Sequence, residues 1–180
     1  SSTIPNPTLL TPMSVDDLYT DLLRRDFVIN TLCIDENGKI LDYLGGQKDI
    51  ENRIIRCVGD ADSKFREDSL RILRAIRFAT ILDFELADDV RDAINKNKGL
   101  VKGLSYYRKK NELDKIFEAR KDKIKEMINV ASTALEIKQI DDAIRYYYWA
   151  NMLLNSLRPG EDVKVKFEGK EMSASLLIKN

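Results

Sequence analysis

The 180-residue sequence contains no histidine and only two cysteines. Without histidine the chain lacks the commonest general base and the commonest metal ligand, and every Ser-His or Cys-His nucleophile pair is excluded. Cys33 and Cys57 stand alone in apolar runs without a CxxC pair. This is typical of small buried side chains in a reducing compartment, so we expect a cytoplasmic protein without disulfides.

An excess of either charge is also missing, because 30 Lys and Arg residues balance 30 Asp and Glu residues. No overall positive field attracts nucleic acid, so any nucleotide or RNA contact must come from a local patch. No apolar run approaches the length of a membrane span, no signal peptide is visible, and we expect no membrane contact. The chain opens Ser-Ser-Thr without a methionine, which indicates a fragment or a processed form.

Apolar spacing and turn residues predict a mainly helical α+β fold. Ser14 and Asp17 form a capping-box-like pair that begins the first helix, whose Leu18, Leu22 and Leu23 face a core. Residues 1–13 are expected to be an irregular lead-in, and residues 27–58 a small sheet remnant with a turn at 36–38. The other expected elements are helices over 65–80, 88–96, 106–117, 121–137 and 141–157, and a β-hairpin over 163–178.

Residues 65–80 are predicted to form one continuous helix around which the other motifs are arranged. Asp68 and Arg71 are three residues apart, so they project from one side and can hold each other in place. A fixed carboxylate accepts hydrogen bonds and a fixed guanidinium donates them, so together they can read the edge of a nucleobase. The alternative is that Glu67–Arg71 and Asp68–Arg71 are ordinary surface ion pairs that stabilise little.

Several linked motifs surround this helix in a specific order. Arg24-Arg25-Asp26-Phe27-Val28-Ile29-Asn30 comes first, followed by Asp42-Tyr43-Leu44-Gly45-Gly46-Gln47-Lys48-Asp49-Ile50. Arg53-Ile54-Ile55-Arg56-Cys57-Val58-Gly59-Asp60 and Glu67-Asp68-x-x-Arg71 come next. In this order and at this spacing, residues 14–117 resemble the bacterial-type tRNA nucleotidyltransferases (CCA-adding enzymes) and their poly(A) polymerase relatives.

The resemblance implies a nucleotide-binding set made of Arg24, Arg25, Asp26, Asn30, Asp68, Arg71 and Arg74. By this resemblance one of the two adjacent arginines binds a triphosphate, Asp26 and Asn30 hold the ribose hydroxyls, and Asp68 and Arg71 accept cytosine and adenine. It implies a hinge at Asp42, Gly45, Gly46 and Asp49, and places Arg108 and Glu112 in a further neck-helix motif. The alternatives are that the arginines merely complement a helix dipole and that the glycines merely form a turn.

The sequence departs from the family at the catalytic metal site. The family takes its metal-holding carboxylates from a glycine-rich turn and an Asp-x-Asp strand upstream of the Arg-Arg-Asp motif, and only Asp16, Asp17 and Asp21 lie there. Asp60 and Asp62 are predicted to cap a helix. We therefore assign no catalytic or metal-binding residue, although the resemblance implies Mg²⁺ with ATP or CTP, and we expect the chain alone to be inactive.

Beyond residue 117 the sequence predicts a helical hairpin of the tetratricopeptide type over 121–157, then the β-hairpin. We place a seam between Phe117 and Lys121 and expect three parts: the end of a head over 1–60, a helical neck over 61–117, and a piece of unassigned family over 118–180. The aromatic run Tyr146-Tyr147-Tyr148-Trp149 favours packing over base stacking, because consecutive helical residues point in different directions.

Two functions from different classes remain after this reading. The first is the nucleotide-recognition portion of a tRNA nucleotidyltransferase or poly(A) polymerase-like protein, with ATP, CTP and a tRNA or other RNA 3′ end as partners. The second is a non-catalytic interaction or scaffold module that binds a protein partner through residues 121–157. The template of the family serves both bases, so the sequence leaves open whether C, A or both are selected.

Overall fold

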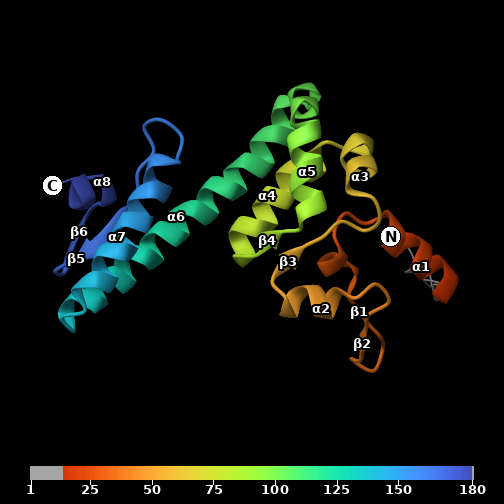
Figure 1. The fold of residues 1–180 in the computed structure, drawn as a ribbon, viewed down its shortest axis with the longest axis horizontal. Helices are drawn as coiled ribbons and strands as arrows, with labels where there is room; N and C mark the ends of the chain where they lie inside the picture. The colour runs from red at the N-terminus through yellow and green to blue at the C-terminus, as the bar shows by residue number, and fades with distance from the viewer. Residues whose placement is uncertain (1–13, 180) are drawn as a thin grey trace, which may run out of the picture.

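The structure is a computed structural model that describes residues 14–179, so the expected lead-in over 1–13 lies outside it. Figure 1 shows an elongated molecule in which one long helix joins an N-terminal body to a C-terminal body. The helices are α1 (Val15–Arg24), α2 (Gly46–Glu51), α3 (Ala61–Glu67), α4 (Leu70–Leu82), α5 (Asp88–Asn97), α6 (Tyr106–Glu136), α7 (Ile140–Asn155) and α8 (Ala174–Lys179), with 3₁₀ turns η1 (Val28–Thr31) and η2 (Lys98–Gly103).

The strands are short and form two-stranded pairs. Together with the helices given above, they confirm the predicted mainly helical α+β class. β1 (Cys33–Ile34) and β2 (Ile40–Leu41) are antiparallel, with Cys33 opposite Leu41. β3 (Ile54–Ile55) and β4 (Glu85–Leu86) are parallel, and β5 (Lys164–Phe167) and β6 (Lys170–Ser173) form an antiparallel hairpin. Within residues 14–179, no helix combines the length and the apolar character needed to cross a membrane.

The first helix begins as the sequence predicts. The Ser14 hydroxyl accepts a hydrogen bond from the Asp17 N–H at 3.1 Å and donates one to the Asp17 carboxylate at 2.7 Å. These bonds satisfy an N–H group that a helix start leaves without a partner. Leu22 is fully buried, but Leu23 is 44% exposed, so the expectation that both leucines face the core was wrong for Leu23.

The central helix is broken in two, so the prediction of one continuous helix over 65–80 was wrong. Asp68 lies between α3 and α4 in an extended conformation (φ −149°, ψ 104°). Its carboxylate accepts a hydrogen bond from the Leu70 N–H at 3.1 Å, and such side-chain bonds compete with the helical backbone. The break lets α3 and α4 contribute to one core, in which Phe65 is fully buried and Ile72 is 2% exposed.

The long helix α6 crosses the expected seam without interruption. The sequence predicted separate helices over 106–117 and 121–137, whereas α6 is a single helix of 31 residues. It contains no glycine or proline, so nothing in its backbone forces a break between Phe117 and Lys121. Its first half packs against α4 and its second half against α7 (Figure 1).

The C-terminal body has its own apolar core. Ile124 and Ile128 of α6 pack with Ala150 and Leu154 of α7, as the predicted helical hairpin requires. The aromatic run divides: two members pack against this core, while the other two are exposed. The packed members are Tyr146 and Tyr147, and the exposed ones are Tyr148 and Trp149.

The expected C-terminal β-hairpin is shorter than predicted. β6 ends at Ser173, and residues 174–179 form α8 instead of continuing the strand. Ala174 is fully buried, and the Ser173 hydroxyl accepts a hydrogen bond from the Leu176 N–H at 3.4 Å. Local capping and burial of Ala174 therefore outweigh the alternating apolar pattern that predicted a strand.

Candidate nucleotide-binding site

The predicted nucleotide-binding residues, Arg24 excepted, converge on one open cleft of about 380 Å³ in the N-terminal body. The segment after α1, which includes η1, contributes an arginine, an aspartate and an asparagine. Asp68 comes from the break between α3 and α4, and α4 contributes the rest. The cleft is lined by Arg25, Asp26, Asn30, Asp68, Arg71, Arg74 and Phe78. Phe78 was not among the predicted site residues, although it lies on the same helical stripe as Arg71 and Arg74.

Asp26 is the most buried polar group of the cleft, with 7% of its surface exposed. One carboxylate oxygen accepts hydrogen bonds from the Phe27 N–H at 2.8 Å and from Asn30 Nδ2 at 3.0 Å. The other oxygen accepts from Arg74 Nε at 2.6 Å. Burial raises the pKa of Asp26, but the hydrogen bonds and the Arg74 charge outweigh it and hold the pKa below its ordinary value.

The two adjacent arginines have different surroundings. Arg25 donates to the Asn30 carbonyl at 2.7 Å and pairs with Asp21 at 3.2 Å, so its guanidinium lies along the cleft. Arg24 lies in the last turn of α1, is exposed, and is not brought into the cleft. The helix-dipole explanation therefore fits Arg24, while Arg25 is the one of the two that lines the cleft.

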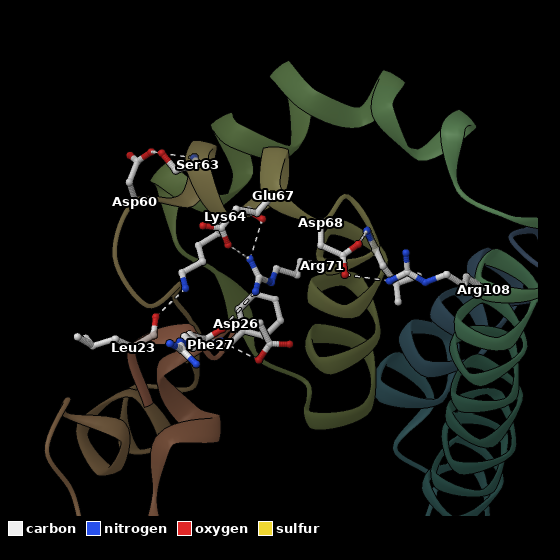
Figure 2. A network of polar contacts seen from close by, with 12 residues as sticks. Leu23, Asp26, Phe27, Asp60, Ser63, Lys64, Glu67, Asp68, Arg71 and Arg108 are labelled. Atoms are coloured by element: carbon white, nitrogen blue, oxygen red, sulfur yellow. Dashed lines mark hydrogen bonds and ion pairs between the residues drawn. The ribbon is translucent and has the colours of Figure 1, made fainter. Parts of the chain in front are cut away.

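Asp68 and Arg71 both line the cleft, but each is held by other residues, so the expectation that they fix one another was wrong. Arg71 Nη1 contacts Glu67 Oε2 at 2.6 Å and the Lys64 carbonyl at 3.1 Å, as Figure 2 shows. Asp68 Oδ2 accepts from Arg108 Nη2 at 2.9 Å. The helix break explains this, because Asp68 leaves the helical path and turns towards α6.

Arg71 also joins the end of α1 to α3. Its Nη2 donates to the Arg24 carbonyl at 3.2 Å, and Lys64 Nζ donates to the Leu23 carbonyl at 2.8 Å (Figure 2). Both carbonyls belong to the last turn of α1, where backbone acceptors lack helical partners. The end of α1 is thus fixed relative to α3 and to the start of α4.

The predicted hinge residues build the start of α2, away from the cleft. The Asp42 carboxylate accepts hydrogen bonds from the N–H groups of Gly45, Gly46 and Gln47 at 2.9, 2.8 and 3.0 Å. Burial raises the pKa of Asp42, but these backbone bonds outweigh it and lower the pKa below its ordinary value. Gly45 adopts a left-handed conformation (φ 85°), which glycine adopts without strain.

The other two residues of this group fix α2 against its neighbours. A Cβ atom at Gly46 would lie 2.9 Å from the Val28 carbonyl oxygen, so only glycine fits there. Asp49 is 4% exposed and receives two hydrogen bonds from Arg56 at 3.0 and 3.1 Å. These contacts describe a well-fixed turn, and its role as a hinge stays a prediction.

Two ion pairs attach α4 and the segment just before it to α6. Arg108 contacts Asp68, and Glu112 contacts Arg77 at 2.7 Å with both side chains largely buried. The Arg77 guanidinium also lies over the Phe78 ring at 4.6 Å, and Phe78 meets Phe27 edge to face at 5.8 Å. Arg108 and Glu112, which the sequence assigned to a further neck motif, therefore support the cleft from outside.

The described residues do not fit a catalytic metal site. Within residues 14–179 there is no group of three or more His, Cys, Asp or Glu side chains that could hold a metal ion. Asp60 caps α3 by accepting from the Ser63 N–H at 2.8 Å, as predicted. Asp62 is held by Asn97 at 2.7 Å and by Arg66 at 2.9 Å. We therefore derive no chemical step through a metal here.

Known proteins match this region in sequence and in structure. The poly A polymerase head domain matches residues 6–56. The CCA-adding enzyme of Bacillus pumilus is 46% identical over 106 residues, which are 59% of this chain and 26% of that protein. The crystal structure of the Bacillus stearothermophilus CCA-adding enzyme in complex with CTP matches with a TM-score of 0.55 and 46% identity, covering 56% of this chain and 25% of that one.

A wider match comes from the Thermotoga maritima CCA-adding enzyme complexed with tRNA. It has a TM-score of 0.52 and 26% identity and covers 74% of this chain and 29% of that one. Because residues 1–117 are a smaller share of the chain than this, the structural similarity extends past residue 117.

These matches identify the class of the N-terminal part, residues 6–56, as a poly A polymerase head domain. More particularly, they confirm the resemblance to the bacterial-type tRNA nucleotidyltransferases (CCA-adding enzymes) that the sequence motifs indicated. The chain spans about a quarter of the length of these relatives.

Proposed function

We propose that the N-terminal body binds a ribonucleoside triphosphate, ATP or CTP, as the nucleotide-recognition portion of a protein that adds nucleotides to the 3′ end of tRNA or another RNA. The observation that carries this proposal is the convergence of cationic, anionic and amide side chains on one open cleft, from the segment after α1, from η1, from the break between α3 and α4, and from α4. Relatives solved with CTP and with tRNA support the choice of ligand and of RNA partner.

The cleft offers separate groups for the three parts of a nucleotide. Arg25 presents a planar guanidinium, a geometry that matches phosphate oxygens. Asn30 lies at the same end, beside the buried Asp26 carboxylate, where an acceptor and an amide suit ribose hydroxyls. Arg24 is an exposed cation outside the cleft.

Asp68 and Arg71 supply an acceptor and a donor for the edge of the base. Each has its position set by protein contacts before any ligand arrives, Asp68 by Arg108 and Arg71 by Glu67. A base whose edge mismatches this pattern leaves polar groups unpaired on both sides, which costs about 1–3 kcal/mol for each group that becomes buried. This is the physical basis on which such a pair selects bases.

Arg74 has a different role from the one the resemblance implies. Its Nε is committed to Asp26 at 2.6 Å, and its guanidinium lies 5.3 Å from the centre of the Phe78 ring. In this position it neutralises the buried carboxylate and holds it against the cleft wall. We propose that Arg74 orients Asp26 and contributes to nucleotide binding through it.

The proposed role is recognition, with the transfer chemistry supplied by groups outside residues 14–179. Nucleotidyl transfer of this kind needs metal-held carboxylates to activate the attacking hydroxyl and neutralise the departing pyrophosphate. The family resemblance implies Mg²⁺ for this step. ATP and CTP would be supplied as their Mg²⁺ complexes. The second candidate, a protein-interaction module at 121–157, predicts instead that the folded chain has no affinity for nucleotides.

The test is a calorimetric titration of ATP and CTP, with magnesium, into the parent chain and into Asp68→Ala and Arg71→Ala variants. We expect saturable binding by the parent and affinity about tenfold or more weaker in either variant, since each loses a charged hydrogen-bonding partner. Arg145→Ala is the matched control, because Arg145 is an exposed arginine paired with Asp142 on α7. Absence of binding by the folded parent contradicts the proposal and favours the interaction module.

A further inference from the structure

The stretch from residue 96 to residue 111 carries a concentration of positive charge that the balanced composition of the whole chain conceals. It contains six cationic side chains and no Asp or Glu. The cationic residues are Lys96, Lys98, Lys102, Arg108, Lys109 and Lys110. Because the chain as a whole has no net charge, a patch of this kind is the local feature that a contact with RNA requires.

Half of these cations are free of acidic partners. The three that pair with a carboxylate are Lys96, Arg108 and Lys110. Lys98, Lys102 and Lys109 form no ion pair within residues 14–179. Lys109 Nζ donates instead to the Lys102 carbonyl at 3.4 Å, which ties the first turn of α6 to η2. Their charges are therefore available to an anion from outside.

Two tyrosines begin α6 in the middle of this positive stretch. Tyr106 and Tyr107 are each 77% exposed, the largest exposed fractions among the large apolar and aromatic side chains of residues 14–179. Consecutive helical residues point about 100° apart, so the two rings offer their faces to two different groups. Exposed aromatic rings among cations are the combination that binds single-stranded nucleic acid, because bases stack on the rings while phosphates contact the cations.

The same stretch borders the proposed nucleotide cleft. Ser69, which follows the cleft residue Asp68, donates from its hydroxyl to the Leu100 carbonyl of η2 at 3.3 Å. The two glycines of η2, Gly99 and Gly103, have no atom within 4 Å of the position where a Cβ atom would lie. A strand of nucleic acid can therefore approach this backbone closely and continue towards the cleft.

We propose that η2 and the first turn of α6 form a platform for single-stranded RNA. Bases stack on Tyr106 and Tyr107, and phosphates lie against Lys98, Lys102 and Lys109. The inference rests on the RNA partner of the proposed function, but not on nucleotide binding in the cleft. An unpaired strand fits this platform better than a duplex, because the bases of a duplex stay stacked on one another and cannot reach the rings.

The test of the tyrosines is a fluorescence-anisotropy titration with a labelled single-stranded RNA of about 12 nucleotides. We expect the double variant Tyr106→Ala/Tyr107→Ala to bind about tenfold more weakly than the parent, because the stacked bases lose their partners. Tyr106→Phe/Tyr107→Phe keeps both rings and should bind within about twofold of the parent. Tyr148→Ala is the matched control, because Tyr148 is an aromatic side chain of α7 that is 66% exposed.

The lysines have a separate readout, which is the dependence of RNA affinity on salt. Each phosphate contact with a single strand contributes about −0.7 to the slope of log affinity against log salt concentration. Lys98→Ala/Lys102→Ala should therefore make the slope shallower by about 1.4, whereas the tyrosine variants should leave it unchanged. Lys164→Ala/Lys170→Ala, which removes two exposed lysines of the C-terminal hairpin, is the matched control.

The outcomes separate the platform from the proposed function. RNA binding that both double-alanine variants leave unchanged, in strength and in salt slope, overturns the platform and leaves an RNA partner standing. Equal losses in the control variants overturn it as well, and so does a preference for a blunt RNA duplex over the single strand. A parent that binds no RNA overturns the platform together with the RNA partner, whereas the titration of ATP and CTP decides nucleotide binding independently.

Discussion

The two bodies of the molecule differ in how their polar groups are paired around the candidate site and away from it. In the N-terminal body, side-chain contacts join segments 40 or more residues apart, as in the pairs Asp26–Arg74, Lys64–Leu23 and Asp68–Arg108. In the C-terminal body several ion pairs, such as Arg145–Asp142 and Arg158–Glu161, join residues three apart, although Arg158 also reaches Asp114, 44 residues away. A long-range polar contact requires that both groups lose bound water and that both segments become ordered, which costs free energy. The concentration of such contacts around one cleft therefore indicates that the geometry of the cleft matters more than its contribution to stability.

The largest effect is expected from the shared core beneath the cleft. Phe65 of α3 is fully buried, and truncation to alanine in Phe65→Ala removes its packing and leaves a cavity. We expect a loss of about 3–5 kcal/mol in the free energy of unfolding, measured by urea denaturation. Tyr148→Ala, which truncates an exposed aromatic of the C-terminal body, is the control. An equal effect of the two substitutions would contradict the assigned core.

An intermediate effect is expected from the buried ion pair of the cleft. Arg74→Ala leaves the Asp26 carboxylate without its charged partner, and we expect a loss of about 1.5–3 kcal/mol at neutral pH. The folded pKa of Asp26 lies below its ordinary value, so this stabilisation is complete above the unfolded-state pKa of about 3.9. It is lost as the pH falls through the lowered folded pKa.

The measurement for Arg74→Ala is therefore urea denaturation of parent and variant at neutral pH and again in the acid range. The difference between the two proteins should shrink on acidification, because a protonated Asp26 no longer needs the guanidinium. A difference that stays constant with pH would mean that Arg74 acts by packing against Phe78 alone.

The smallest effect is expected from an exposed ion pair of the C-terminal body. Arg145 and Asp142 lie three residues apart on α7, and their side chains are 70% and 41% exposed. We expect Arg145→Ala to lower the free energy of unfolding by less than about 1 kcal/mol and to leave nucleotide affinity unchanged. The same denaturation and titration measurements check this, and a large loss in either would erase the contrast between the two bodies.

Local features were predictable from the sequence, and contacts between distant segments were not. The Ser14 cap, the cap at Asp60 and the turn around Gly38 follow from a few neighbouring residues. The helix break at Asp68 was missed, because the apolar spacing on either side of it continues in helical register. The direction in which an aspartate turns after leaving a helix depends on what lies opposite, and here that is Arg108.

The site could be assembled from the sequence only through the order of its motifs. Family resemblance grouped Arg25, Asp26, Asn30, Asp68 and Arg71, and the structure brings these residues to one cleft. It did not show that Arg74 is committed to Asp26 or that Phe78 forms part of the wall. We expected a break near Phe117 because the resemblance to the family ended there. The residues on both sides of this position favour a helix, and α6 continues through it.

The continuity of α6 gives the chain a rotational register. The helix is 31 residues long, about 46 Å, and the residues that face α4 and those that face α7 sit on one rigid axis. A single residue inserted between the two packed halves would turn the C-terminal body by about 100° around that axis and move it by only about 1.5 Å. The number of residues between positions 118 and 123 therefore sets the orientation of the C-terminal body around the α6 axis. In this stretch we expect evolution to tolerate substitutions better than insertions or deletions.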